Sequence, residues 1–99
     1  MDFMIHLDGS RVYELPAEER DEVIKREHAH AHELMATGVL KHIWRLPGQR
    51  GNVGIWSAAD ADALEQVLSS LPIRPHADIQ VTPLATHPLT VELADQRSH

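Results

Sequence analysis

A carboxylate and an imidazole, Glu27 and His28, lie next to each other in a stretch that is otherwise apolar on one side of a helix. The apolar members recur at the three- and four-residue spacing of a single helix face, and they are Val23, Ile24, Ala31, Leu34 and Met35. Burying an unpaired ionisable group is costly, so a helix that only packed against a sheet would carry Leu or Ala at these two positions. General acid–base catalysis uses these two kinds of group. The spacing therefore predicts a proton-transfer site on this helix.

The composition predicts one small globular domain. The chain has 99 residues, of which 42% are hydrophobic, enough for a single compact core. Cysteine is absent, which excludes disulfides and thiolate metal sites. The net charge is −6 and the basic residues form no run, so nucleic acid is not an expected partner. Asp2, His6 and Asp8 interrupt the first apolar residues, so we expect no membrane span and a cytoplasmic location.

The first half of the chain reads as a strand, a long helix and a second strand. A strand over 3–7, which could extend toward Tyr13, precedes a helix from Pro16 to about Thr37 that Gly38 ends. The next strand covers 39–46, and simple alternation puts Leu40, His42 and Trp44 on one of its faces.

After a turn at Pro47-Gly48, the second half of the chain again reads as a strand, a helix and a strand. A strand over 52–57 is followed by a helix that Ser57 or Asp60 can cap and that Pro72 ends. The residues 77–82 alternate as a half-buried strand, and a tail follows from Leu84.

The resulting order, β-α-β-β-α-β, predicts an α+β fold of the ferredoxin-like type with an antiparallel sheet. We expect one domain over residues 1–90 and a C-terminal tail over 91–99. Both helices should cover one face of the sheet and leave the other bare, with Trp44 and Trp56 on two central strands needing cover. We expect both tryptophans to pack at the sheet interface, although an edge of one could form a pocket floor. An exposed apolar face predicts a homo-oligomer, with sheets packed face to face as in dimeric α+β barrels and then a larger ring.

With the elements placed, several motifs become recognisable in order: His-Ile-Trp-Arg-Leu-Pro-Gly at 42–48, Asn52, Leu-Pro-Ile-Arg-Pro at 71–75, Val-Thr-Pro-Leu at 81–84 and His-Pro at 87–88. Together the motifs resemble the muconolactone delta-isomerase family, in register over roughly residues 20 to 90. The resemblance implies the ferredoxin-like subunit, a ring of dimers (a decamer in that family) and a reaction without a cofactor. That reaction belongs to aromatic degradation through the 3-oxoadipate pathway. It moves a proton within an unsaturated lactone carboxylate so that the ring double bond shifts.

Position by position, Glu27 matches the family's glutamate on the first helix, and Asn52 matches the strand asparagine that lines the pocket. Arg45 matches the arginine after the tryptophan. The other pocket positions depart from the family: His28 stands where many members have lysine, Arg50 where the well-known members have tyrosine, and Arg74 and His76 where aromatic residues are usual. The resemblance therefore implies an altered pocket wall.

Lactone isomerisation needs a base, a donor to the developing oxyanion and an anchor for the substrate carboxylate. Glu27 and His28 are competing candidates for the base, since burial raises a carboxyl pKa and imidazole suits proton shuttling near neutral pH. Either could instead stabilise an interface, Glu27 through Arg26, Lys25 or a neighbouring subunit.

Asn52 could donate to an enolate oxygen or simply close the preceding turn with a hydrogen bond. The candidates for gripping the carboxylate are Arg45, Arg50 and Arg74, and His76 could close the pocket mouth.

No metal site is expected, because only His28 and His32 share a helix face while His30 points away. Two alternatives to the isomerase stay open: a relative that dehalogenates or otherwise acts on a substituted lactone, and a small-molecule-binding protein that has lost the chemistry.

Overall fold

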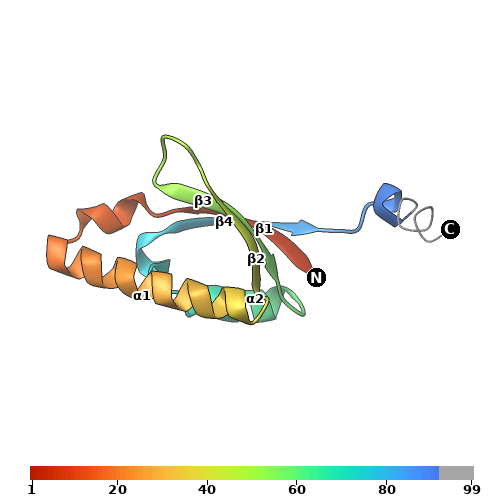
Figure 1. Ribbon diagram of the computed structural model, residues 1–99, viewed down its shortest axis with the longest axis horizontal. Coiled ribbons are helices and arrows are strands. Elements are labelled where there is room, and N and C mark those ends of the chain that lie inside the picture. The colour runs from red at the N-terminus through yellow and green to blue at the C-terminus, as the bar shows by residue number, and fades with distance from the viewer. Residues whose placement is uncertain (92–99) are drawn as a thin grey trace.

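The computed structural model describes residues 1–91 and shows a sheet with two helices on one of its faces (Figure 1). The strands are β1 (Asp2–Asp8), β2 (Leu40–Arg45), β3 (Gly51–Ser57) and β4 (Asp78–Leu84). The helices are α1 (Ala17–Ala36) and α2 (Ala61–Ser69), with short 3₁₀ helices η1 (Ser10–Glu14) and η2 (Arg74–His76). The expected order of strands and helices is confirmed.

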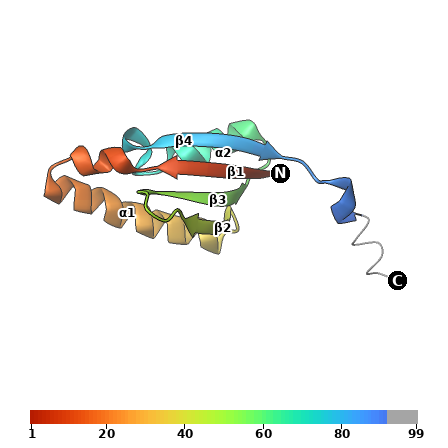
Figure 2. The same cartoon turned by 90° about the horizontal axis from the view of Figure 1, so that it is seen from above.

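The sheet is four-stranded and antiparallel, with the strand order β2-β3-β1-β4 (Figure 2). This is the ferredoxin-like arrangement, so the predicted fold class is confirmed. The central strands are β1 and β3, whereas β2 is an edge strand. The prediction that Trp44 lies on a central strand is therefore wrong.

Both helices lie where the sequence predicts them, and local sequence features explain where they begin or end. The first begins after Pro16 with Glu18 and Glu19 in its first turn, where the positive end of the helix dipole favours carboxylates. It ends before Gly38, whose φ of 80° is a left-handed conformation that glycine adopts without strain. Asp60 caps α2 by accepting a 2.8 Å hydrogen bond from the main-chain N–H of Ala63.

The hydrophobic core lies between the sheet and the helices. Alternate residues of β1, Phe3, Ile5 and Leu7, point to the helix side and are almost fully buried. They pack with residues of the other elements: Val12, Val23, Leu34, Leu40, Trp56, Leu64, Leu68, Leu71, Ile73 and Ala77. In the apolar stripe of α1, Val23 and Leu34 are buried, but Met35 stays 43% exposed.

A β-bulge in β2 changes which residues share a face. Leu40 pairs with Trp56 and His42 pairs with Ile55, so the register shifts across the residue between them. Opposite residues of an antiparallel pair point to the same side, which puts Leu40 on the helix face with Ile43. The predicted grouping of Leu40 with His42 and Trp44 is therefore wrong.

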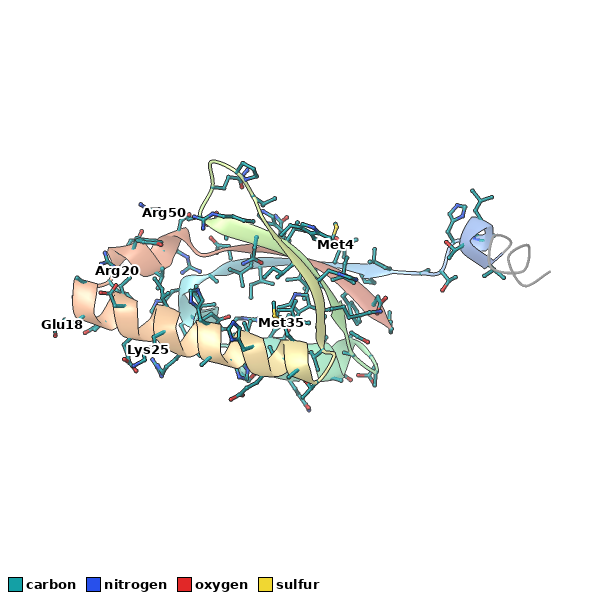
Figure 3. The ribbon with its side chains drawn as sticks, viewed as in Figure 1. Met4, Glu18, Arg20, Lys25, Met35 and Arg50 are labelled. Atoms are coloured by element: carbon teal, nitrogen blue, oxygen red, sulfur yellow. The ribbon has the colours of Figure 1, made fainter. Side chains whose placement is uncertain are left out.

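The opposite face of the sheet carries no helix and exposes apolar side chains. Trp44 is 55% exposed there and stacks on His42 with ring centroids 5.7 Å apart. Met4 on β1 and Leu84 on β4 are each 38% exposed on the same face, and Figure 3 shows Met4 on the side away from α1. Trp56 was expected on this face, but it is buried on the helix face, opposite Phe3. That expectation is wrong.

The remaining differences are at element ends. The first strand stops at Asp8, and η1 takes up the stretch toward Tyr13. The last strand continues to Leu84, so the tail begins later than expected. Most of the predicted tail, 92–99, lies outside the described residues. Within residues 1–91, the helices are too short or too polar to cross a bilayer.

Candidate active site

A cavity of about 400 Å³ lies between the sheet and α1. Leu7, Leu40 and Trp56 form its apolar side on the sheet, and Ile24, Ala31 and Leu34 form the opposite wall on α1. The strand ends, the β2–β3 hairpin and η1 supply the polar rim. The cavity is large enough for a small organic ligand and offers it an apolar interior with a few polar groups, which is the usual character of such sites.

Glu27 projects from α1 into this cavity and is only partly exposed. Its Oε2 accepts a 3.1 Å hydrogen bond from the main-chain N–H of Ile73. Burial raises the pKa of Glu27 above the ordinary 4.5, and the hydrogen bond from Ile73 and the nearby His30 and His28 oppose this only in part. The expected alternative partner, Arg26, lies instead 3.8 Å from a carboxylate oxygen of Glu22.

The three histidines of α1 do not converge. His28 lines the cavity and is exposed. His30 points toward α2, where its Nε2 lies 3.0 Å from Oγ of Ser70, and its Nδ1 lies 3.5 Å from Glu33. His32 is exposed and is not among the cavity residues. Of these imidazoles, His28 is the one placed to act beside Glu27.

Asn52 lies on the helix face of β3 and lines the cavity. In the described part of the chain, its side chain makes no hydrogen bond to the preceding turn; the turn is closed by main-chain bonds such as Leu46 N to Gly51 O at 3.2 Å. These contacts therefore do not support the alternative role of Asn52, which was to close the preceding turn with a hydrogen bond. Its side-chain amide is available to a ligand.

Trp56 supplies part of the cavity's apolar side, four residues beyond Asn52 along β3. Its indole lies over Gly54, where a Cβ would come within 3.1 Å of the indole nitrogen and within 2.7 Å of the carbonyl oxygen of His42. Gly54 therefore makes room for both a flat indole and a close neighbouring strand. The Trp56 N–H is buried and has no hydrogen-bond partner among residues 1–91.

Two of the three predicted arginines reach the cavity. Arg45 comes from the end of β2 and Arg50 from the β2–β3 hairpin, and both line the polar rim. Within residues 1–91, neither forms an ion pair with a carboxylate. The guanidinium of Arg50 instead stacks on the ring of Tyr13, with its Cζ 3.8 Å from the ring centroid.

The other two predicted pocket residues lie elsewhere. Arg74 is held by an ion pair of 3.1 Å with Glu65 of α2 and does not line the cavity. His76 borders a shallow groove on another side of α1, together with Glu18 and Glu22. A single chain therefore brings Glu27, His28, Asn52, Arg45 and Arg50 together and leaves Arg74 and His76 apart.

The profile of the muconolactone delta-isomerase family matches residues 1–90. The chain belongs to this family.

Individual relatives agree with the family assignment. The chain is 33% identical to a muconolactone delta-isomerase of Cupriavidus pinatubonensis over 90% of its own length and 97% of that protein. It is 35% identical to the enzyme of this name from Rhodococcus opacus, over 86% of the chain and 91% of the relative.

A solved structure extends the agreement to three dimensions. A crystal structure of muconolactone isomerase superposes with a TM-score of 0.83 at 26% sequence identity, covering 89% of this chain and 92% of that one. The resemblance and the isomerase class expected from the sequence are confirmed.

The place of Tyr13 in the site of this family member was not anticipated from the sequence, and Trp56 was expected mainly as a packing residue of the sheet. Tyr13 falls in a stretch toward which the first strand was expected to extend, and nothing in its spacing indicates that η1 carries it to the cavity. Trp56 had a signal that could have placed it: an isolated glycine inside a strand, Gly54, indicates a close approach on that face.

Proposed function

We propose that this chain isomerises a muconolactone-type lactone carboxylate by moving one proton, with Glu27 as the base. The observation that carries the proposal is the position of this carboxyl group. It is partly buried in a ligand-sized cavity and held through one oxygen by Ile73 N–H. A carboxyl group whose pKa is raised toward neutrality is a better base when ionised.

The proposed reaction takes a proton from the saturated ring carbon next to the carbon–carbon double bond that is conjugated with the lactone carbonyl. The electron pair of that C–H bond delocalises to the carbonyl oxygen, which gives a dienolate and a protonated Glu27. Return of the same proton to another carbon of the conjugated system shifts the ring double bond and regenerates the carboxylate. No electrons leave the substrate, so the step needs no oxidant or reductant.

The other groups take roles that follow from their chemistry. The Asn52 amide is the proposed donor to the dienolate oxygen, because its N–H groups form no hydrogen bond within residues 1–91. Arg45 and Arg50 are the proposed binding groups for the side-chain carboxylate, since a guanidinium can grip a carboxylate through two hydrogen bonds.

Glu27 is preferred over His28 as the base because only Glu27 is positioned by a hydrogen bond within residues 1–91. His28 is exposed, and its imidazole lies at the edge of the cavity. Its proposed role is to assist by interacting with Glu27 or with the substrate carboxylate.

The proposed working form is a homo-oligomer of dimers packed through the bare sheet face. Exposed Trp44, Met4 and Leu84 on one face support this, because apolar patches of this kind mark association surfaces. Ring size and a cytoplasmic location stay predictions.

The direct test is incubation of the purified protein with muconolactone while the ultraviolet spectrum is recorded. Loss of the substrate spectrum and formation of the isomeric lactone are expected. A chlorinated muconolactone tested in parallel separates the alternative, because release of halide without isomerisation would identify a dehalogenase. Binding of either lactone without turnover would contradict both activities.

A further inference from the structure

The aromatic ring beneath Arg50 gives this side chain a role that Arg45 does not share. Tyr13 belongs to η1 and Arg50 to the β2–β3 hairpin, and both line the cavity at its exposed end. Figure 3 shows Arg50 at the hairpin end of β3, on the side where η1 lies. The Cζ of Arg50 is 3.8 Å from the Tyr13 centroid, whereas Arg20 approaches the same ring only to 5.8 Å.

The main chain holds both partners of this stack. The N–H of Gly9 donates a 2.9 Å hydrogen bond to the carbonyl oxygen of Arg50, which joins the hairpin to the start of η1. The carbonyl of Gly9 then accepts a 3.1 Å bond from Val12 N–H, which shapes η1 itself. A Cβ added at Gly9 would lie 3.6 Å from the carbonyl oxygen of Arg50, an ordinary van der Waals contact, so the two segments lie directly side by side here.

A guanidinium that stacks through its flat face keeps the N–H donors at its edge free. In the described chain, other arginines use those donors on carboxylates: Arg11 on Asp78 and Arg74 on Glu65, each at 3.1 Å. No acceptor of this kind contacts Arg50 within residues 1–91. The guanidinium of Arg50 is therefore oriented by the Tyr13 ring, and its N–H groups can still donate hydrogen bonds.

We propose that Tyr13 is a positioning residue that presents Arg50 to the substrate carboxylate, and that this pair sets the preference of the site for an anionic lactone. The inference rests on the proposed function for the identity of the ligand. Its physical basis is pre-organisation: a long side chain that is already ordered loses less freedom when it binds. Arg50 acts on the carboxylate, and Tyr13 acts only through Arg50.

The test uses the saturated lactone carboxylate, which has no ring double bond to shift, and its neutral methyl ester. Their dissociation constants are measured by calorimetry for the full chain and its variants. Arg50→Gln should weaken binding of the acid about 10- to 100-fold, the loss of a charge-assisted hydrogen-bonded pair, with little change for the ester. Tyr13→Leu should weaken binding of the acid about two- to fivefold, the range for a cation–π contact near solvent.

Three comparisons separate positioning from a general effect on folding. Tyr13→Phe keeps the ring and should bind the acid like the wild type. Arg20→Gln, a matched change near the same ring, should also leave binding unchanged, because Arg20 pairs with Asp21. Tyr13→Leu should have no further effect once Arg50 has been replaced by Gln.

The inference is overturned if Tyr13→Leu weakens binding of the acid and of the ester equally. It is also overturned if Tyr13→Leu weakens binding of the acid as much in the Arg50→Gln variant as in the wild type. It is also overturned if the wild type shows no preference for the acid over the ester. Turnover of muconolactone is measured on the same samples. Its absence would refute the proposed isomerase, while the dissociation constants would still decide the role of Tyr13 and Arg50.

Discussion

Ile73 N–H donates a 3.1 Å hydrogen bond to Oε2 of Glu27, and this contact joins the middle of α1 to the segment that follows α2. The bond holds one carboxylate oxygen in place and leaves the other to the cavity. It also favours the ionised form of a group whose burial favours the neutral form. Burial prevails, so the pKa of Glu27 is raised at the site where we propose that a proton is accepted.

The first prediction concerns the pH dependence of turnover. The base must be ionised in the free enzyme, so kcat/KM for muconolactone should rise with pH, with a midpoint above the ordinary 4.5 of a glutamate. Initial rates between pH 4 and pH 8 measure this limb. Replacing His28 by Gln should leave the rising limb in place. A profile that is flat down to pH 4.5 would contradict a raised pKa for the catalytic carboxyl.

The second prediction concerns stability. Since the folded-state pKa of Glu27 is raised, the folded chain binds more protons than the unfolded chain between pH 4.5 and that raised value. Stability contributed by this group is therefore present below pH 4.5 and is lost as the pH rises through the folded-state pKa. The Gln side chain of Glu27→Gln cannot ionise, so this variant should be at least as stable as the wild type at pH 7. The difference in the free energy of unfolding between variant and wild type should be smaller at pH 4. Urea unfolding at the two pH values measures the difference, and a variant less stable only at pH 7 would reverse the predicted sign.

The third prediction concerns Asn52. If its amide donates to the dienolate oxygen, Asn52→Ala should lower kcat about 10²- to 10³-fold, as is typical for loss of one oxyanion donor. KM should change little, because the charge on that oxygen develops only during the reaction. Steady-state kinetics separate the two parameters. A rise in KM with kcat unchanged would instead make Asn52 a ground-state binding residue.

The fourth prediction concerns the bare sheet face. Trp44→Lys places a charge on the proposed interface and should convert the oligomer into smaller species, which light scattering after gel filtration detects. Trp44 is 55% exposed in the single chain, so the change should not unfold the subunit. Met35→Lys is the matched control, since Met35 is 43% exposed but lies on α1, on the helix side of the sheet. An unchanged mass for Trp44→Lys would exclude this face as the interface.

The fold could be predicted from the sequence because its signals are local. Gly38 ends a helix through its own backbone conformation, and Asp60 caps the next helix within one turn. The period of the apolar residues identified each strand, but not always the face it buries. In β3 both sides carry large apolar residues, Ile55 on one and Trp56 on the other, so the pattern alone could not decide which side the helices cover.

Only part of the candidate site could be predicted from the sequence in this way. Glu27 stands out because a carboxylate breaks an apolar stripe, which is a local anomaly. Its partner Ile73 is 46 positions away and contributes only a main-chain N–H, so no residue type signals the contact. The β2 bulge that brings Leu40 to the cavity is likewise a feature of hydrogen-bond register and leaves no mark in composition.

The central claim is that Glu27 is the base, and the most direct measurement is kcat for muconolactone isomerisation by Glu27→Gln and His28→Gln, made separately. The carboxamide keeps the shape and can still accept the bond from Ile73, but it cannot take a proton. Glu27→Gln should lose about 10²- to 10⁴-fold in kcat, the usual contribution of a general base, while His28→Gln should lose far less. A Glu27→Gln enzyme that retains turnover within a few fold of the wild type would contradict the assignment.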